Sequence, residues 1–247
     1  MPVLTKKQLD EGYFEKAGGF PSLSQNPIDR TNFAHEVNEY NGQKQLCISC
    51  TQLCSAALFK DQKVYSVREQ KRILNEWVEF LCTNTKTFKA LHFSSHVPQK
   101  LFDAACCQEN LEELRFKWGN YKNLSALENL KKLKFLYLGS CPSVQNISPL
   151  LKLSNLTVLF IENFKRIEDY SPLAALSQLE QLVICGPILG NTPIKDYEFL
   201  RKMQNLKSVW FPNTVIRKKY TSDELEALQL ALPNITFMYD SFPKSKT

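Results

Sequence analysis

The 247-residue sequence lacks a long apolar run and is poor in glycine, histidine and methionine. No stretch approaches the ~18 consecutive apolar residues of a membrane-spanning helix, so we expect no membrane association. The first residues, MPVLTKKQLDEGYFEK, contain no apolar run after their lysines, which excludes a typical secretory signal peptide. Gly186 and Gly190 lie in a predicted turn, and no glycine-rich phosphate-binding loop is present.

Neither sign of charge dominates the chain. The formal net charge is +6, and 43% of the residues are hydrophobic, as in an ordinary folded globular protein. The basic doublets lie outside the predicted strands, whereas a nucleic-acid-binding protein shows a basic stripe interleaved with aromatic residues on one face. We therefore interpret the basic residues as a solvated surface or as contacts for an acidic protein partner, rather than as a nucleic-acid site.

Cysteine is present eight times, but its pattern does not predict a metal site. Cys47, Cys50 and Cys54 have the short spacing of zinc ligands, yet no second pair of ligands with matching spacing follows. We interpret them as buried structural thiols, and we expect no cofactor. Reduced thiols without an export signal are typical of a cytoplasmic protein.

The most informative positive feature is a repeated block that opens with the pattern LxxLxL. Successive blocks are 22 to 23 residues apart at first and 27 to 29 residues apart for the last two. A fixed period in this range predicts a solenoid in which each repeat packs on its neighbours. The blocks begin at Phe88, Leu111, Leu133, Leu156, Leu179, Leu206 and Ile235.

The segments NISPLLKLSNLTVLFIEN (146–163) and DYSPLAALSQLEQLVICG (169–186) resemble the leucine-rich-repeat superfamily, in particular its short 22-residue subclass of internalins and phosphatase-regulating proteins. The resemblance covers about residues 88–240 and looks closest to cytoplasmic bacterial members. It implies an α/β solenoid with a curved parallel β-sheet on the concave face. Short helices and 3-10 turns would form the convex face, with a helical cap at the N-terminus.

One position departs from the superfamily pattern. An asparagine or cysteine usually follows the LxLxL core by three residues and bonds the turn backbone of adjacent repeats. Only Cys141 fits here, so the turns must satisfy their backbone groups in other ways. The residues at this position are His96, Gly119, Cys141, Phe164, Pro187 and Thr214.

We divide the chain into an N-terminal cap region with a divergent first repeat (1–87), the leucine-rich repeats (88–242) and a tail (243–247). In the cap, apolar spacing predicts a short helix over 29–40, a strand over 45–50 and a stronger helix over 66–82. Ser66 with Glu69 forms a capping box, and Thr221 with Glu224 opens a second helix near 222–231. Ser-Pro pairs predict short convex helical turns.

Side chains alternate between the two faces of a strand, so the residue between the two leucines of each LxL points to the concave face. This row contains Tyr137, Phe160 and Trp210, with Phe135 beside it. Six aromatic rings near this face, even half exposed, would present on the order of 500 Å². We predict a partner-binding surface; the alternative is that the rings stack on each other or are covered by the N-terminal region. The expected contact residues are Arg115, Lys117, Trp118, Phe135, Tyr137, Phe160, Glu162, Trp210 and Tyr239.

No catalytic arrangement is evident around the three histidines. His92 lies beside Glu113 and Arg115 in the predicted sheet, but no nucleophile is placed with it. Cys185 and Ser94 lie on the same face, and nothing in the sequence places a base beside Cys185.

The sequence therefore predicts a non-enzymatic protein-binding module, monomeric before it binds its partner. An immunity protein or antitoxin that occludes a toxin, or a regulatory adapter, fits this description by analogy. Two alternatives stay open: an enzyme-associated repeat protein resembling bacterial ubiquitin-ligase effectors, and a nucleic-acid binder.

Overall fold

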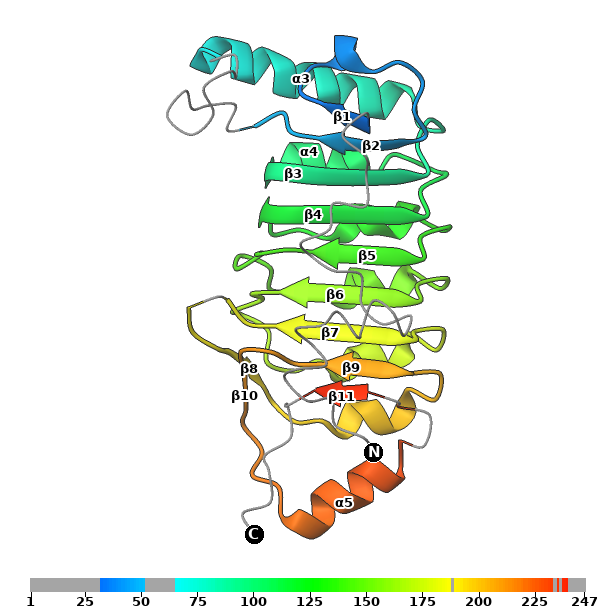
Figure 1. The fold of residues 1–247 in the computed structure, drawn as a ribbon, viewed down its shortest axis with the longest axis vertical. Helices are drawn as coiled ribbons and strands as arrows, with labels where there is room; N and C mark the ends of the chain where they lie inside the picture. Colours follow the sequence, from blue (N-terminus) through cyan, green and yellow to red (C-terminus); the bar gives the residue numbers. More distant parts are fainter. Residues whose placement is uncertain (1–31, 52–64, 188, 233–234, 236, 240–247) are drawn as a thin grey trace.

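The computed structural model describes residues 32–51, 65–187, 189–232, 235 and 237–239. Within them, one parallel sheet of nine strands runs the length of the molecule (Figure 1). From one edge to the other its strands are β1 (Phe33–Ala34), β2 (Gln45–Ile48), β3 (Ala90–Pro98), β4 (Glu113–Asn120), β5 (Phe135–Leu138), β6 (Val158–Glu162), β7 (Gln181–Cys185), β9 (Ser208–Trp210) and β11 (Phe237–Tyr239).

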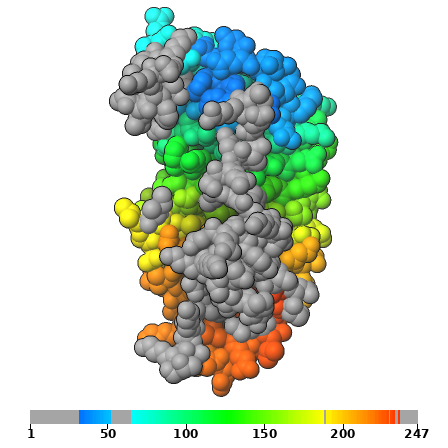
Figure 2. Space-filling model, in the orientation of Figure 1, coloured from blue at the N-terminus to red at the C-terminus, as the bar shows by residue number. Residues whose placement is uncertain are grey.

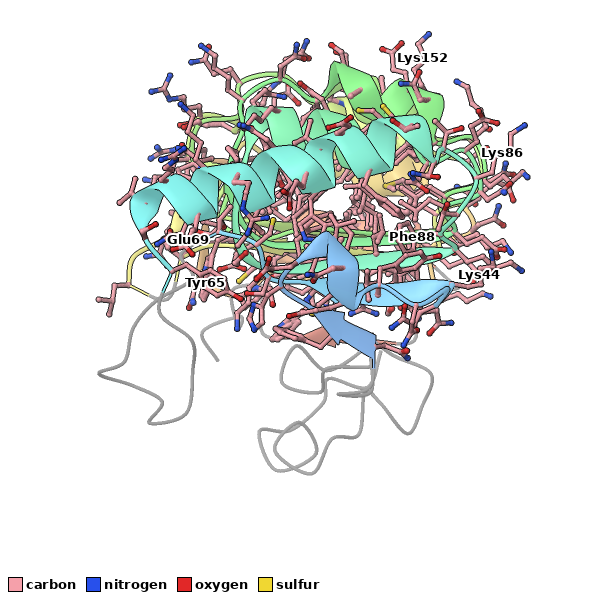
Figure 3. All side chains as sticks on the ribbon, turned by 90° about the horizontal axis from the view of Figure 1, so that it is seen from above. Lys44, Tyr65, Glu69, Lys86, Phe88 and Lys152 are labelled. Atoms are coloured by element: carbon pink, nitrogen blue, oxygen red, sulfur yellow. The ribbon has the colours of Figure 1, made fainter. Side chains whose placement is uncertain are left out.

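The helical segments of the repeats lie on one face of this sheet (Figures 1 and 3). Leucines from these segments, such as Leu150 and Leu173, are fully buried in one core with Leu136, Leu159 and Leu182 of the strands. The predicted α/β leucine-rich-repeat solenoid is thereby confirmed. The segments are α4 (Gln99–Ala105) and the 3-10 helices η3 (Ser125–Asn129), η4 (Ser148–Lys152), η5 (Ser171–Ala175) and η6 (Glu198–Lys202).

Each of these four 3-10 helices begins in the same way. An Asn or Asp side chain accepts a hydrogen bond from the backbone N–H two residues later, at 2.9 Å in all four cases. This turn is a local alternative to a helical cap, and the predicted prolines follow it in η4 and η5. The four acceptors are Asn123, Asn146, Asp169 and Asp196.

The turns after the strands are bonded through backbone groups, including at positions that lack the asparagine. Gly119 N, at one of these positions, donates to Gly139 O at 3.1 Å, and Asn163 N donates to Cys185 O at 2.7 Å. A second set of bonds forms where each repeat enters its strand: Asn155 Nδ2 and Asn205 Nδ2 donate to carbonyl oxygens of the preceding repeat, both at 2.7 Å. Neighbouring repeats are therefore linked at both ends of each strand.

The first part of the cap differs from the prediction. The helix expected over 29–40 is wrong for the described part of that range, which holds β1 and a 3-10 turn, η2 (Val37–Glu39). Phe33 and Ala34 instead pair in parallel with Cys47 and Ile48 of the confirmed strand β2. Pairing with the open edge of the sheet satisfies backbone groups that a local apolar pattern does not reveal.

The second cap helix, α3 (Val67–Thr83), forms where the sequence predicts it. Ser66 and Glu69 make the reciprocal bonds of the capping box, at 3.2 and 2.8 Å. One stripe of the helix, including Trp77, is fully buried. Seen from above, α3 lies across the end of the solenoid, with Phe88 on the sheet side of it and Lys86 at the periphery (Figure 3).

At the C-terminal end, the longer repeats hold additional structure. Their extra residues form a small parallel pair, β8 (Thr192–Ile194) and β10 (Thr214–Ile216). Helix α5 (Ser222–Leu230) follows, and Thr221 and Glu224 bond each other as predicted, at 2.9 and 3.2 Å. Colours run in sequence order along the visible surface, as expected for stacked repeats (Figure 2). Among the described helices, none is long and apolar enough to cross a bilayer.

Candidate protein-binding surface

The face of the sheet opposite the helical segments, here called the concave face, carries its side chains in straight rows. Backbone register aligns Arg115, Tyr137, Phe160, Val183 and Trp210 across five neighbouring strands. Residues two positions earlier form a parallel row, which runs through Glu113, Phe135, Val158, Gln181 and Ser208. The alternation predicted from the sequence thus places the candidate side chains together.

The centre of the concave face is more closed than the sequence predicts. The side chains of Tyr137, Phe160 and Val183 form a buried cluster with exposures of 6%, 3% and 0%. The rings of Tyr137 and Phe160 meet edge to face with their centroids 4.8 Å apart. Tyr137 and Phe160 are therefore buried and not half exposed as expected, and they pack on each other and on their row neighbours. The alternative of cover by the N-terminal region concerns residues 1–31, which lie outside the described residues.

Arg115 lies at one end of this cluster and is itself buried, with 6% exposure. Its Nε atom donates to Glu113 Oε1 on the same strand at 2.5 Å. Its guanidinium carbon lies 4.0 Å from the centroid of the Phe135 ring on the next strand. The charge is therefore balanced by a carboxylate and by the ring face, as a buried arginine requires.

At the other side of the cluster, the Tyr137 hydroxyl donates to Glu162 Oε2 at 2.7 Å. Burial, reinforced by the Glu162 carboxylate, raises the pKa of Tyr137, so the phenol stays protonated and remains a donor. Glu162 pairs in register with Cys185, whose Sγ donates to Gly186 O at 3.0 Å. This edge of the face is consequently polar and fixed by hydrogen bonds.

The rim of the concave face is open. Trp118 is 43% exposed, and the Lys117 ammonium, itself exposed, lies 4.9 Å from the centroid of its ring. Phe135 and Trp210 are half-buried against the central cluster. Tyr239 is placed at the end of the row by its pairing with Trp210; its side chain lies outside the described part. Exposed rim residues around a packed floor are the parts that a partner can touch.

The ionisable groups on this face do not favour catalysis. Burial, with smaller contributions from Arg115 and Lys117, lowers the pKa of His92 to about 4, so the ring is neutral at physiological pH. Burial and the nearby Glu162 carboxylate raise the pKa of the Cys185 thiol to about 12, which makes it a poor nucleophile. His92 and Cys185 lie on strands β3 and β7, with three strands between them.

The cysteines of the cap behave as structural side chains. Cys47 and Cys50 are fully buried, and Cys54 lies outside the described residues. Over the part of the chain that the structure describes, no group of three or more His, Cys, Asp or Glu side chains is arranged to hold a metal ion.

No family model matches this chain, and neither does any curated protein. Among solved structures, it is similar to an internalin (inlF) from Listeria monocytogenes, with 23% identity and a TM-score of 0.47 over 64% of this chain. It is also similar to internalin C2 from the same organism, with 23% identity and a TM-score of 0.48, covering 69% of this chain and 70% of that one. A leucine-rich-repeat protein from Leptospira interrogans matches 89% of this chain and 57% of its own length, with 13% identity and a TM-score of 0.38.

The chain spans about half the length of the first internalin, 49% of that structure. Likeness at these levels of identity and TM-score carries no argument about function. The fold assignment rests on the strand order, the register and the leucine core of this chain.

Sequence reasoning placed Glu113 and Arg115 side by side on the concave face, and the structure joins them in an ion pair. It missed one feature of this surface. Ser208 is 3% exposed, and its hydroxyl has no hydrogen-bond partner among the described residues. Nothing in the local sequence indicates its burial.

Proposed function

We propose that this protein is a non-enzymatic module that binds one protein partner through its concave face. The observation that carries the proposal is the unbroken register from Arg115 to Trp210, which joins cationic, aromatic and acidic side chains into one surface. Solenoids offer such extended surfaces for binding. Interface hot spots are enriched in tryptophan, tyrosine and arginine, the residue types found here.

Different residues of this surface have different tasks in the proposal. Tyr137 and Phe160 form a rigid floor, because they are already packed in the unbound chain. Trp118 and Lys117 are exposed and contact the partner directly. Phe135, Glu162 and Trp210 are partly exposed around the floor and complete the contact, together with Arg115 on one side and Tyr239 on the other. A preorganised floor lowers the ordering cost of binding.

The neutral His92 and the protonated Cys185 favour a binding role over catalysis. We further propose a cytoplasmic bacterial protein that acts as an immunity protein or antitoxin toward a toxin, or as a regulatory adapter. Cys82, Cys107 and Cys185 are free thiols at exposed or partly exposed positions, which is compatible with a reducing compartment. The kind of partner rests on analogy alone.

The test compares two variants of the full chain in capture experiments from the native lysate. Lys117→Ala/Trp118→Ala changes the exposed rim and leaves the floor intact. Lys131→Ala/Lys152→Ala is the matched control: Lys152 ends η4 on the side of the helical segments (Figure 3), and Lys131 is exposed just after η3. We expect one stoichiometric partner, bound at least ~10-fold more weakly by the rim variant and normally by the control.

Each other outcome has a definite meaning. Equal binding by both variants would remove the concave rim as the binding site. Loss of binding in both variants, with unchanged circular dichroism, would move the site to the opposite side. Hydrolysis or modification of the captured partner in the presence of the protein would contradict a non-enzymatic role.

A further inference from the structure

The ends of two helices bring a pair of cysteine thiols into contact at the N-terminal end of the solenoid. Cys82 lies in the last turn of α3, and Cys107 follows α4 by two residues. Their Sγ atoms are 3.7 Å apart, although the residues are 25 positions apart in the sequence. Cys82 is exposed and Cys107 is partly exposed, so a small reagent in solution can reach the pair.

The backbone on both sides of this contact is fixed by one buried side chain. Gln108, which follows Cys107 directly, is 0% exposed. Its Nε2 atom donates to Leu81 O at 2.7 Å and to Asn84 O at 3.0 Å, on the two sides of Cys82. Its Oε1 atom accepts from Phe88 N at 3.2 Å. The fold therefore holds the two thiols together independently of their own weak contact.

Further bonds join the same two segments outside the thiol pair. Glu109 N donates to Thr85 O at 2.7 Å, and the Thr85 hydroxyl donates to Glu109 Oε1 at 3.1 Å. The Lys86 ammonium lies 3.6 Å from Glu109 Oε2. With the backbone anchored in this way, disulfide formation requires mainly side-chain rotation, which shortens the sulfur–sulfur distance by about 1.7 Å to the bonded value.

We propose that Cys82 and Cys107 form a reversible disulfide bond under oxidising conditions, a modification that ties the N-terminal cap helix α3 to the repeat that contains α4. The oxidant is a low-molecular-weight disulfide such as oxidised glutathione. The bond closes a loop of about 25 residues and restricts the unfolded chain. This proposal does not depend on the proposed binding function, because the thiols lie away from the concave face.

The chemistry is two successive thiol–disulfide exchanges. The Cys82 thiolate attacks one sulfur of oxidised glutathione, and one glutathione thiolate leaves. The Cys107 thiolate then attacks the Cys82 sulfur, and the second glutathione leaves. Two protein thiols are oxidised, one glutathione disulfide is reduced to two thiols, and the protons lost by Cys82 and Cys107 are taken up by the two glutathiones.

The order of attack follows from the exposure of the two thiols and from the raised pKa of Cys107. Cys82 is the more exposed thiol and meets the oxidant first. Burial, followed by the contact with Cys82, raises the pKa of Cys107 to about 11. The closing step needs the Cys107 thiolate and is therefore expected to become faster as the pH rises toward that value.

The experiment equilibrates the full-length protein in glutathione buffers of increasing oxidised fraction. Free thiols are trapped with acid and alkylated, and the digested peptides are analysed by mass spectrometry. We expect a Cys82–Cys107 cross-linked peptide that dithiothreitol reverses, with the buried Cys106 remaining a free thiol. The oxidised protein should unfold at a temperature several degrees higher than the reduced protein.

Three variants make the result specific. Cys107→Ser should stop at a stable glutathione adduct on Cys82, and Cys82→Ser should react far more slowly at Cys107. Cys185→Ser, which changes a partly exposed thiol on the other face of the sheet, should form the cross-link normally. Circular dichroism establishes that each variant is folded.

The proposal is overturned if the wild-type protein accumulates a glutathione adduct on Cys82 without a cross-link. Free Cys82 and Cys107 under excess oxidised glutathione would overturn it as well. A cross-link that joins either cysteine to a different residue would show that the observed contact does not direct the chemistry.

Discussion

The two faces of the sheet are made from alternate residues of the same strands, yet they are packed in different ways. On the convex side, Leu136, Leu159 and Leu182 meet the leucines of the 3-10 helices in one continuous core. On the concave side, Tyr137, Phe160 and Val183 form a separate, smaller cluster with polar groups at both ends. The first face repeats large apolar side chains, mostly leucine, whereas the second changes its chemistry from strand to strand.

The difference in packing means that the residues of the two faces are under different constraints. The leucine face must fit the same convex segment in every repeat, so its residue type is constrained. The concave face must only pack with its row neighbours, so it accepts arginine, tyrosine, phenylalanine or valine at equivalent positions. The side chains that differ in charge and polarity from repeat to repeat therefore lie on the concave face, where a partner can contact them.

The largest expected effect compares neighbouring residues on opposite faces. Leu159→Ala removes a fully buried side chain from the main core and should lower the free energy of unfolding by about 2–5 kcal/mol. Val158→Ala removes a half-buried side chain from the concave face and should cost less than about 1 kcal/mol. Urea denaturation measures both, and equal losses would contradict the distinction between the faces.

The second prediction concerns the turn where the two faces meet. A Cβ atom on Gly186 would lie 1.8 Å from Asn213 O, a backbone atom that cannot rotate away. Gly186→Ala should therefore lower the free energy of unfolding by about 2–3 kcal/mol. Lys165→Ala, at an exposed position of an equivalent turn, serves as the control in thermal denaturation and should change little. A stable Gly186→Ala protein would mean that the turn can open.

The third prediction is a pH dependence of stability that arises at His92 on the concave face. The folded chain holds the pKa of His92 at about 4, below its ordinary value of 6.5. Between these values the unfolded chain binds more protons, so stability is complete above pH 6.5 and falls as the pH decreases toward 4. The shift corresponds to about 3 kcal/mol, which solvent screening of the partly exposed ring reduces to about 2 kcal/mol.

Denaturation curves at pH 7.0 and 4.5 test this contribution in the wild type and in His92→Gln. The variant should lose less stability on acidification than the wild type. His96→Gln, which changes a nearby histidine on the same strand, is the matched control. An identical loss in wild type and His92→Gln would assign the acid sensitivity to other groups.

The smallest expected effect tests the polar edge of the concave cluster. The bond between Tyr137 and Glu162 can be isolated with Tyr137→Phe, Glu162→Gln and the double variant. We expect a coupling free energy of about 1 kcal/mol from the double-mutant cycle, because a hydrogen bond to a carboxylate is retained inside a mostly buried site. A coupling of zero would place both side chains in water.

The sequence predicted the architecture because the period and the leucine spacing repeat many times. Strands at Leu136, Leu159 and Leu182 and the helix after Ser66 formed as expected, since each has a strong local pattern. The segment with Phe33 was predicted as a helix but pairs as an edge strand, because its partner Cys47 lies 14 residues away.

For the candidate surface, the sequence predicted which residues are neighbours but not which of them are buried. Alternation in the strands placed Tyr137, Phe160 and Trp210 in one row, as the register shows. The near-complete burial of Tyr137 and Phe160 depends on how the rings pack across strands, which periodicity does not contain. The contact between Cys82 and Cys107 was equally hidden, because it depends on how two helix ends meet.

The Asn and Asp side chains that open the 3-10 helices bond within their own repeats, whereas the strand-entry bonds of Asn155 and Asn205 reach the repeat before. A duplicated repeat would thus contain the side chain that starts its own 3-10 helix. It would also contain the asparagine that bonds to the backbone of the preceding repeat. Gene duplication could lengthen such a chain by one strand spacing of about 4.8 Å without redesign of its neighbours. Each new strand would then add one more position to the concave row for selection to vary.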